Sequence, residues 1–112
     1  MAYIPDRGHW VWLNFSPRAG HEQAGPRPGL VLSAAAFNQH SGKCVVCPIT
    51  NTRRGLRTHV TIPTGQAVTG VVLCEHLRSV DYRARGIRYI GIAPNDVIDA
   101  VTEIVTSLID PT

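Results

Sequence analysis

Two polar segments of this 112-residue chain carry the side chains best suited to chemistry on a phosphate. The first, residues 16–27, contains Glu22, Gln23 and Arg27, and the second, residues 50–58, contains Thr50 followed by several arginines. A carboxylate, a permanently charged guanidinium and a hydroxyl brought together would stabilise the pentacoordinate phosphorane formed when a phosphodiester is cleaved. A plain solvent-exposed loop is the alternative interpretation of each segment.

The histidines and cysteines lack the spacing of metal ligands. Cys44 and Cys47 form a C-x-x-C, but an offset of three places them on opposite faces of a strand, which favours buried structural thiols over a shared metal. One or two of the histidines could act as general acid and base, and His21 and His76 lie beside the two polar segments; a surface or partly satisfied histidine is the alternative for each. The five are His9, His21, His40, His59 and His76. No nucleotide-binding P-loop, hydrolase elbow or zinc-protease motif is present. We expect no metal and no cofactor.

Short runs rich in Val, Ile, Trp and Thr predict the strands that must position these segments. We expect strands at 8–15, 30–33, 43–49, 57–62, 70–75 and 88–92, and a helical turn over 34–39 that Gly42 ends. In the first strand, Val11 and Phe15 would face one side and Trp10 the other. This order predicts a mainly-β sandwich or barrel in a single domain, residues 1–112.

The C-terminal segment predicts a helix that follows the strands. Pro94 suits its first turn, and Asp96 and Asp99 would complement the positive end of the helix dipole. The apolar residues recur at the 3.6-residue period and form one stripe; they are Val97, Ile98, Val101, Ile104, Val105, Leu108 and Ile109.

The charge of the chain is uneven. All eleven Lys and Arg, ten of them Arg, lie in residues 1–92 beside only four acids, a balance of +7, and the last twenty residues carry −4. Arg matches phosphate and stacks on bases, so this bias favours a nucleic-acid ligand over a merely solvated basic surface. No signal pattern and no apolar run of roughly 18 residues occurs, and three cysteines argue against a disulfide framework. We expect a soluble, cytoplasmic protein that does not insert in a membrane.

One extended motif connects the first polar segment to a known family. The run Gly20-His-Glu-Gln-Ala-Gly-Pro-Arg-Pro28, followed by Leu30-Val-Leu-Ser33, resembles the G-x-E-Q-x-G-x-R-P loop of the MazF/PemK (Kid-like) toxin endoribonucleases. Further landmarks match in order along almost the whole chain: 4–6, 8–12, 47–50, 79–86 and 91–96. The resemblance implies an SH3-like β-barrel with a C-terminal α-helix, which forms a homodimer.

The resemblance also implies a toxin of a type II toxin–antitoxin pair that cuts single-stranded mRNA without a metal or a small-molecule cofactor. Attack by the 2′-OH would leave a 2′,3′-cyclic phosphate and a 5′-OH, and a cognate antitoxin with an acidic tail would block the site. Arg27 and Thr50 match the family's catalytic pair, and Glu22 matches its supporting acid. The RNA would lie in a groove across the dimer interface, where we expect contacts from Gln23, Arg53, Arg54, Arg57 and His76.

The roles within this set follow from protonation. Guanidinium stays protonated, so we interpret Arg27 as the charge stabiliser, with a role as acid left open, and Glu22 as the general base. The chain departs from the family pattern at His9, where Asp or Glu is frequent, and at His76, where Gln is common.

Two other functions remain: a CcdB-like gyrase-poisoning toxin without nuclease activity, and a non-catalytic SH3-like nucleic-acid-binding module. The G-x-E-Q-x-G-x-R-P loop favours the nuclease, because the CcdB-like group lacks it.

Overall fold

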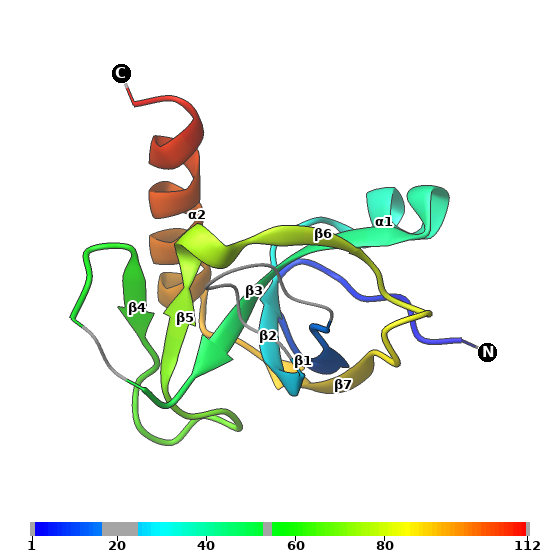
Figure 1. Cartoon of the computed structure of the whole chain (residues 1–112), viewed down its shortest axis with the longest axis horizontal. Coiled ribbons are helices and arrows are strands. Elements are labelled where there is room, and N and C mark those ends of the chain that lie inside the picture. Colours follow the sequence, from blue (N-terminus) through cyan, green and yellow to red (C-terminus); the bar gives the residue numbers. More distant parts are fainter. Residues whose placement is uncertain (1, 17–24, 53–54, 112) are drawn as a thin grey trace.

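The computed structural model describes residues 2–16, 25–52 and 55–111 and has a mainly-β architecture with a C-terminal helix. Its strands form one antiparallel sheet in the order β4-β5-β3-β2-β1-β7, with β6 beside the first half of β3 (Figure 1). The elements in chain order are β1 (His9–Asn14), β2 (Pro26–Val31), α1 (Ala35–Ser41), β3 (Lys43–Thr50), β4 (His59–Thr61), β5 (Val71–Leu73), the 3-10 helix η1 (Cys74–His76), β6 (Arg78–Asp81), β7 (Arg88–Ile92) and α2 (Asn95–Ile109). The predicted fold class is confirmed.

The sheet is curled, but among the described residues no strand pairing joins its two edges into a closed barrel. β4 and β7 are the two ends of the pairing order. Beyond the strands, the Asn14 N–H donates to the Arg85 carbonyl at 3.0 Å, which joins the end of β1 to the turn after β6. The curl therefore encloses apolar side chains on its inner face.

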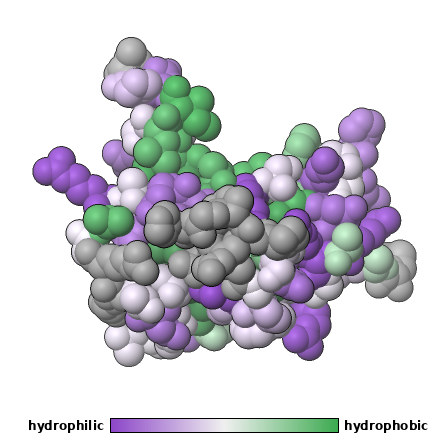
Figure 2. Space-filling view, viewed as in Figure 1, coloured by the Kyte–Doolittle hydropathy of each residue, from purple (hydrophilic) through white to green (hydrophobic). Residues whose placement is uncertain are grey.

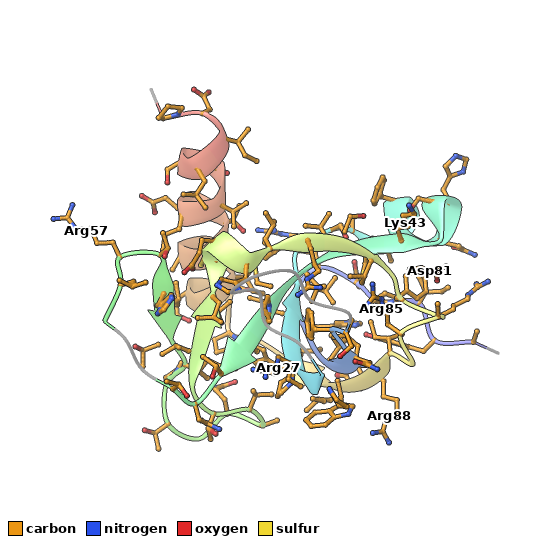
Figure 3. The ribbon with its side chains drawn as sticks, viewed as in Figure 1. Arg27, Lys43, Arg57, Asp81, Arg85 and Arg88 are labelled. Carbon is orange, nitrogen blue, oxygen red and sulfur yellow. The ribbon has the colours of Figure 1, made fainter. Side chains whose placement is uncertain are left out.

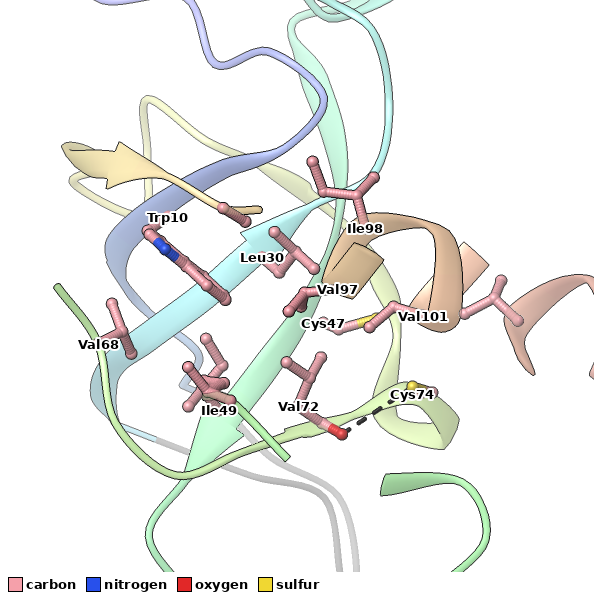
Figure 4. Packing of buried hydrophobic residues seen from close by; sticks show 13 residues of the cluster. Trp10, Leu30, Cys47, Ile49, Val68, Val72, Cys74, Val97, Ile98 and Val101 are labelled. Atoms are coloured by element: carbon pink, nitrogen blue, oxygen red, sulfur yellow. Dashed lines mark hydrogen bonds between the residues drawn. The ribbon is translucent and has the colours of Figure 1, made fainter. Parts of the chain in front are cut away.

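Alternation along the strands divides the interior into two cores. The helix-side core, which α2 covers, contains Trp10, Leu30, Cys47, Ile49 and Val72 among its members (Figure 4). The inner core, inside the curl, is made of Val11, Leu13, Phe15, Val31, Cys44, Val46, Val80 and Tyr82. The predicted two-sided pattern of the first strand is confirmed, because Trp10 and Phe15 belong to different cores.

Helix α2 packs through its predicted stripe and leaves its C-terminal end uncovered. Val97, Ile98, Val101 and Val105 are buried, whereas Leu108 is 49% and Ile109 is 77% exposed. The space-filling view has hydrophobic atoms along this helix (Figure 2). Pro94 is the N-cap and the helix begins at Asn95, one residue later than a helix with Pro94 in its first turn. No helix of the described chain is long and apolar enough to cross a membrane.

Two parts of the sheet differ from the prediction. β2 begins at Pro26 instead of Leu30, so Arg27 lies in a strand and not in a loop. The prolines at 26 and 28 argue locally against a strand because they lack an N–H, yet pairing with β1 extends to Pro26 opposite Asn14. β6 was not expected at all: its ladder with β3 forms a strand from a segment with little local β pattern.

The remaining differences concern element lengths. The predicted strands at 57–62 and 70–75 are shortened to β4 and β5, and the end of the second becomes η1. The predicted helical turn is confirmed as α1, which Gly42 ends at φ 73°. Such a left-handed C-cap suits glycine.

Candidate active site

Arg27 and Thr50 lie opposite each other on adjacent strands. The β2–β3 ladder pairs Gly29 with Pro48, and continuing that register by two residues places Arg27 across from Thr50. Because side chains alternate, both residues share the face of the inner core. Gly29 fits there because an added Cβ would lie 3.1 Å from Cζ of Phe15. The strands therefore bring together the two residues predicted as the catalytic pair.

The Arg27 guanidinium lies at the point where the β2–β3 ladder stops. Pro28 has no N–H to donate to β3, and Arg27 Nη1 approaches the Ile49 carbonyl oxygen instead, at 3.5 Å. Burial lowers the pKa of Arg27 from its ordinary value. The group remains a cation near neutral pH, and partial burial strengthens its attraction for a phosphate oxygen.

The Thr50 hydroxyl is oriented by the chain that follows it. Its Oγ1 accepts a hydrogen bond from the Thr52 N–H at 3.2 Å, which leaves the hydroxyl hydrogen available to a ligand. Gly70 packs against the same place at φ 114°, and a Cβ there would lie 2.3 Å from the Thr50 carbonyl oxygen. The glycine thus permits the close approach that fixes the end of β3.

A second arginine, Arg78, reaches the same face and was missed by the sequence analysis. It pairs with Val46 across β3 and β6, and its Nη1 donates to the Phe15 carbonyl at 2.9 Å. Its guanidinium also lies over the Phe15 ring, 5.2 Å from the centroid. Only the β3–β6 ladder places Arg78 here, so no local signal identifies it.

Hydrogen bonds join the two sides of the first polar segment where it leaves β1 and enters β2. Phe15 N–H donates to the Gly25 carbonyl at 2.9 Å, and Gly25 N–H donates to Ser16 Oγ at 2.8 Å. Arg85 adds a bond to the Ser16 carbonyl. Arg78 and Arg85 therefore bring two cations to the strand end next to Arg27.

The other predicted site residues divide into three groups. Glu22, Gln23, Arg53 and Arg54 lie outside the described residues. Arg57 is exposed and points away beyond β4, whereas Arg27 lies at the centre of the sheet (Figure 3). His76, in η1, lies with its Nε2 3.9 Å from the Glu75 carboxylate, and the same carboxylate lies 3.1 Å from His59 Nε2. Glu75 and His59 were not predicted as site residues, because only the β4–β5 ladder brings them together.

The cysteines occupy structural positions. Cys44 belongs to the inner core and Cys47 to the helix-side core, which confirms the prediction that they face opposite sides of one strand. Burial raises the pKa of Cys44 and of Cys74 to about 12, so both are held as thiols near neutral pH. Among the described residues no group of three or more His, Cys, Asp or Glu could hold a metal ion.

His9 fixes the N-terminal segment to the sheet. Its Nδ1 lies 2.6 Å from the Tyr3 hydroxyl, and its ring packs between Tyr3, at a centroid distance of 5.8 Å, and Tyr89, at 5.0 Å. His9 belongs to the end of β1 opposite the one next to Arg27. Its departure from the family pattern is therefore a packing feature remote from the site.

Comparison with known proteins assigns the family. Residues 6–109 match the family of PemK-like, MazF-like toxins of type II toxin–antitoxin systems. The endoribonuclease toxin MazF of Escherichia coli K12 is 38% identical over 96 residues, which cover 85% of this chain and 86% of the relative. The endoribonuclease toxin ChpB of the same organism is 41% identical over 99 residues, 84% of each chain.

Solved structures agree with these sequence matches. MazF of Deinococcus radiodurans superposes with a TM-score of 0.93 at 48% identity, over 96% of this chain and 98% of that one. A MazE–MazF structure from the same organism has a TM-score of 0.86 at 42% identity, over 97% and 98%. The chain belongs to the PemK-like, MazF-like toxin family. The comparisons favour the nuclease over the gyrase-poisoning and non-catalytic alternatives, because the matched relatives are named endoribonucleases.

Proposed function

We propose that this chain is an endoribonuclease toxin that cuts single-stranded mRNA without a metal. The observation that carries the proposal is the placement of Arg27 across from Thr50 on one face of the sheet, with Arg78 on the same face. The named activity of the family's relatives supports it. Cutting mRNA would block translation, which accounts for toxicity.

The proposed reaction uses the RNA's own 2′-OH as the nucleophile. Glu22 removes the 2′-OH proton, the 2′-oxygen bonds to the adjacent phosphorus, and the bond from phosphorus to the 5′-oxygen breaks. The leaving 5′-oxygen takes up a proton from the Arg27 guanidinium or from water, and the products are a 2′,3′-cyclic phosphate and a 5′-OH. An internal nucleophile needs no metal-bound hydroxide, and it restricts the reaction to ribose.

Arg27 and Thr50 stabilise the charge that develops on phosphorus. The guanidinium binds two non-bridging oxygens with its planar fork, and the Thr50 hydroxyl donates one further hydrogen bond. The Arg27 guanidinium carries only N–H donors, so beside the phosphate it also suits protonation of the leaving oxygen. An unpaired strand is required because the sugar must rotate until the 2′-oxygen lies in line with the bond that breaks.

The partners follow from the surface and from the relatives. The exposed apolar end of α2 at Leu108 and Ile109 suits burial against a second copy, which gives a homodimer. Solved MazE–MazF structures support a cognate antitoxin, and a disordered acidic tail would fit the arginines around Arg27. Gln23, Arg53, Arg54, Arg57 and His76 would contact the RNA. An action on mRNA would fit a cytoplasmic location.

The first prediction concerns cleavage and its dependence on Arg27. The protein should cut a long RNA in excess EDTA, and Arg27→Ala should lower kcat at least roughly a hundredfold, because it removes the charge at the phosphate. Primer extension locates the cuts. Arg83→Ala is the matched control, since it removes an exposed arginine from the β6–β7 turn.

Both rival functions give the opposite result. A gyrase-poisoning toxin or a non-catalytic binding module would leave the RNA intact. Equal cleavage by the wild type and by a folded Arg27→Ala variant would remove Arg27 from the mechanism.

A further inference from the structure

The face that carries Thr50 continues across two more strands. β5 pairs Val71 with Thr50 on one side and with Thr61 on the other, so these three side chains form one row. His59 pairs with Leu73 and lies two residues from Thr61 along β4, hence on the same face. Two strand spacings and two residue steps separate His59 from Thr50 by roughly 12 Å. This separation would bring a nucleotide next to the scissile phosphate close to the partly exposed Glu75 end of the face.

An oriented carboxylate lies here, that of Glu75. The His59 side chain is only 6% exposed, and its Nε2 lies 3.1 Å from Glu75 Oε2. A carboxylate only accepts, so His59 Nε2 carries the hydrogen. Burial alone would raise the pKa of Glu75, but hydrogen bonds from its own backbone N–H, the Thr58 hydroxyl and His59 outweigh burial and lower it. Glu75 is therefore ionised at neutral pH while 30% of its side chain stays exposed.

A fixed anion on this face does not serve affinity for phosphates. Glu75 is one of four acids in residues 1–92, and a carboxylate repels the RNA backbone that the surrounding arginines attract. The groups of RNA that a carboxylate does bind are the N–H donors of unpaired bases. His76, 3.9 Å from the same carboxylate, adds a ring beside which a base can stack.

On the basis of the proposed function, we propose that Glu75 determines sequence specificity by reading a base next to the cleaved bond. Its carboxylate, held by His59 and Thr58, accepts a hydrogen bond from the exocyclic amino group of adenine, cytosine or guanine. Uracil is disfavoured, because it has no amino group and its single N3–H donor lies between two carbonyl oxygens that repel the carboxylate. His59 acts as a positioning residue for Glu75 and does not contact the RNA.

The test measures binding and cleavage separately on short RNAs. Each RNA holds one mapped cleavage site, and each flanking position is varied through the four bases. A second set carries a 2′-deoxy sugar at the cleaved nucleotide, so that fluorescence anisotropy reports binding without turnover. At one flanking position the wild type should prefer amino-bearing bases over uracil by roughly five- to a hundredfold in both assays.

Three variants examine the assignment. Glu75→Gln should reduce that preference to less than about twofold, because an amide also donates to the oxygens of uracil. His59→Phe and Thr58→Val, which keep the shape and remove the bonds to the carboxylate, should each weaken the preference in part. Far-ultraviolet circular dichroism and the unfolding midpoint establish that each variant is folded.

The outcomes separate this proposal from the proposed function. Retention of the full base preference in Glu75→Gln, or no preference for amino-bearing bases in the wild type, would overturn the role of Glu75. Base-selective binding that depends on Glu75, without cleavage of any RNA, would support the role of Glu75 and contradict the nuclease. Equal binding of all four bases, together with efficient cleavage, would support the nuclease and contradict the role of Glu75.

Discussion

At the scale of single residues, the site combines a cation that cannot serve as a base with a hydroxyl whose oxygen is already occupied. Arg27 has its pKa lowered by burial yet remains charged, and Thr50 accepts from Thr52 N–H and keeps its hydrogen for a ligand. Neither removes a proton from the 2′-OH at neutral pH. A carboxylate from the first polar segment is the natural base, and Glu22 is the one we assign.

The pH dependence of cleavage tests that division of roles. A carboxylate base works only when deprotonated, so the wild-type rate should rise with pH through the pKa of Glu22, ordinarily near 4.3, and then level off. Glu22→Gln should abolish this rise and lower the plateau. Arg27→Lys should keep the rise and lower kcat, because lysine retains the charge but not the fork.

The measurement is kcat against pH for both variants, between about pH 4 and 8. Loss of the acidic limb in Arg27→Lys, with its retention in Glu22→Gln, would reverse the two assignments.

At the scale of elements, glycine at position 70 fixes the end of β3. Gly70→Ala would place a Cβ 2.3 Å from the Thr50 carbonyl oxygen, at φ 114°, so the strand end must move. We expect a loss of unfolding free energy of roughly 1–3 kcal/mol and a fall in kcat. Urea denaturation and the cleavage rate measure the two effects.

Gly65→Ala is the matched control for this change. Gly65 also has a positive φ, 94°, but an added Cβ meets nothing within 4 Å. It should cost stability through backbone strain while leaving kcat unchanged. Equal losses of kcat in both variants would show that Gly70 does not position Thr50.

Local sequence patterns predict the elements whose hydrophobic periodicity is strong. They fail for segments that become strands only through pairing with another strand. The stripe of α2 and the two-sided pattern of β1 were predicted because apolar residues recur at the helical period in one and at every second position in the other. β6 and the first four residues of β2 were not predicted, since β6 is held by its ladder with β3 and the start of β2 contains Pro26 and Pro28.

The same reason limits prediction of the site. Arg27 and Thr50 were found through a family motif, and the β2–β3 register then brings them together. Arg78, His59 and Glu75 carry no motif of their own. Their placement depends on which strands pair and in which register, a property that spacing along the chain does not contain.

At the scale of the whole molecule, the uncovered end of α2 is a candidate contact between two copies. Leu108 and Ile109 are exposed at the end of a helix whose earlier turns are buried. Ile109→Asp should shift the protein toward monomers in sedimentation equilibrium and reduce cleavage per chain, because a charge there opposes burial. Ser107→Asp, an exposed residue of the same turn, is the control.

A dimer that persists at the same concentration in Ile109→Asp would place the contact elsewhere. Monomers with full cleavage activity would contradict a groove that spans two copies.

At the same scale, we propose that Arg27 and Thr50 act on a phosphate that the 2′-OH of the neighbouring ribose attacks. The most direct measurement compares one RNA that contains a single cleavage site with its twin carrying a 2′-deoxy sugar at the cleaved nucleotide, and identifies the termini by mass spectrometry. The all-ribose RNA should be cut to a 2′,3′-cyclic phosphate and a 5′-OH, while the twin stays intact. Cleavage of the twin at the same rate would contradict it.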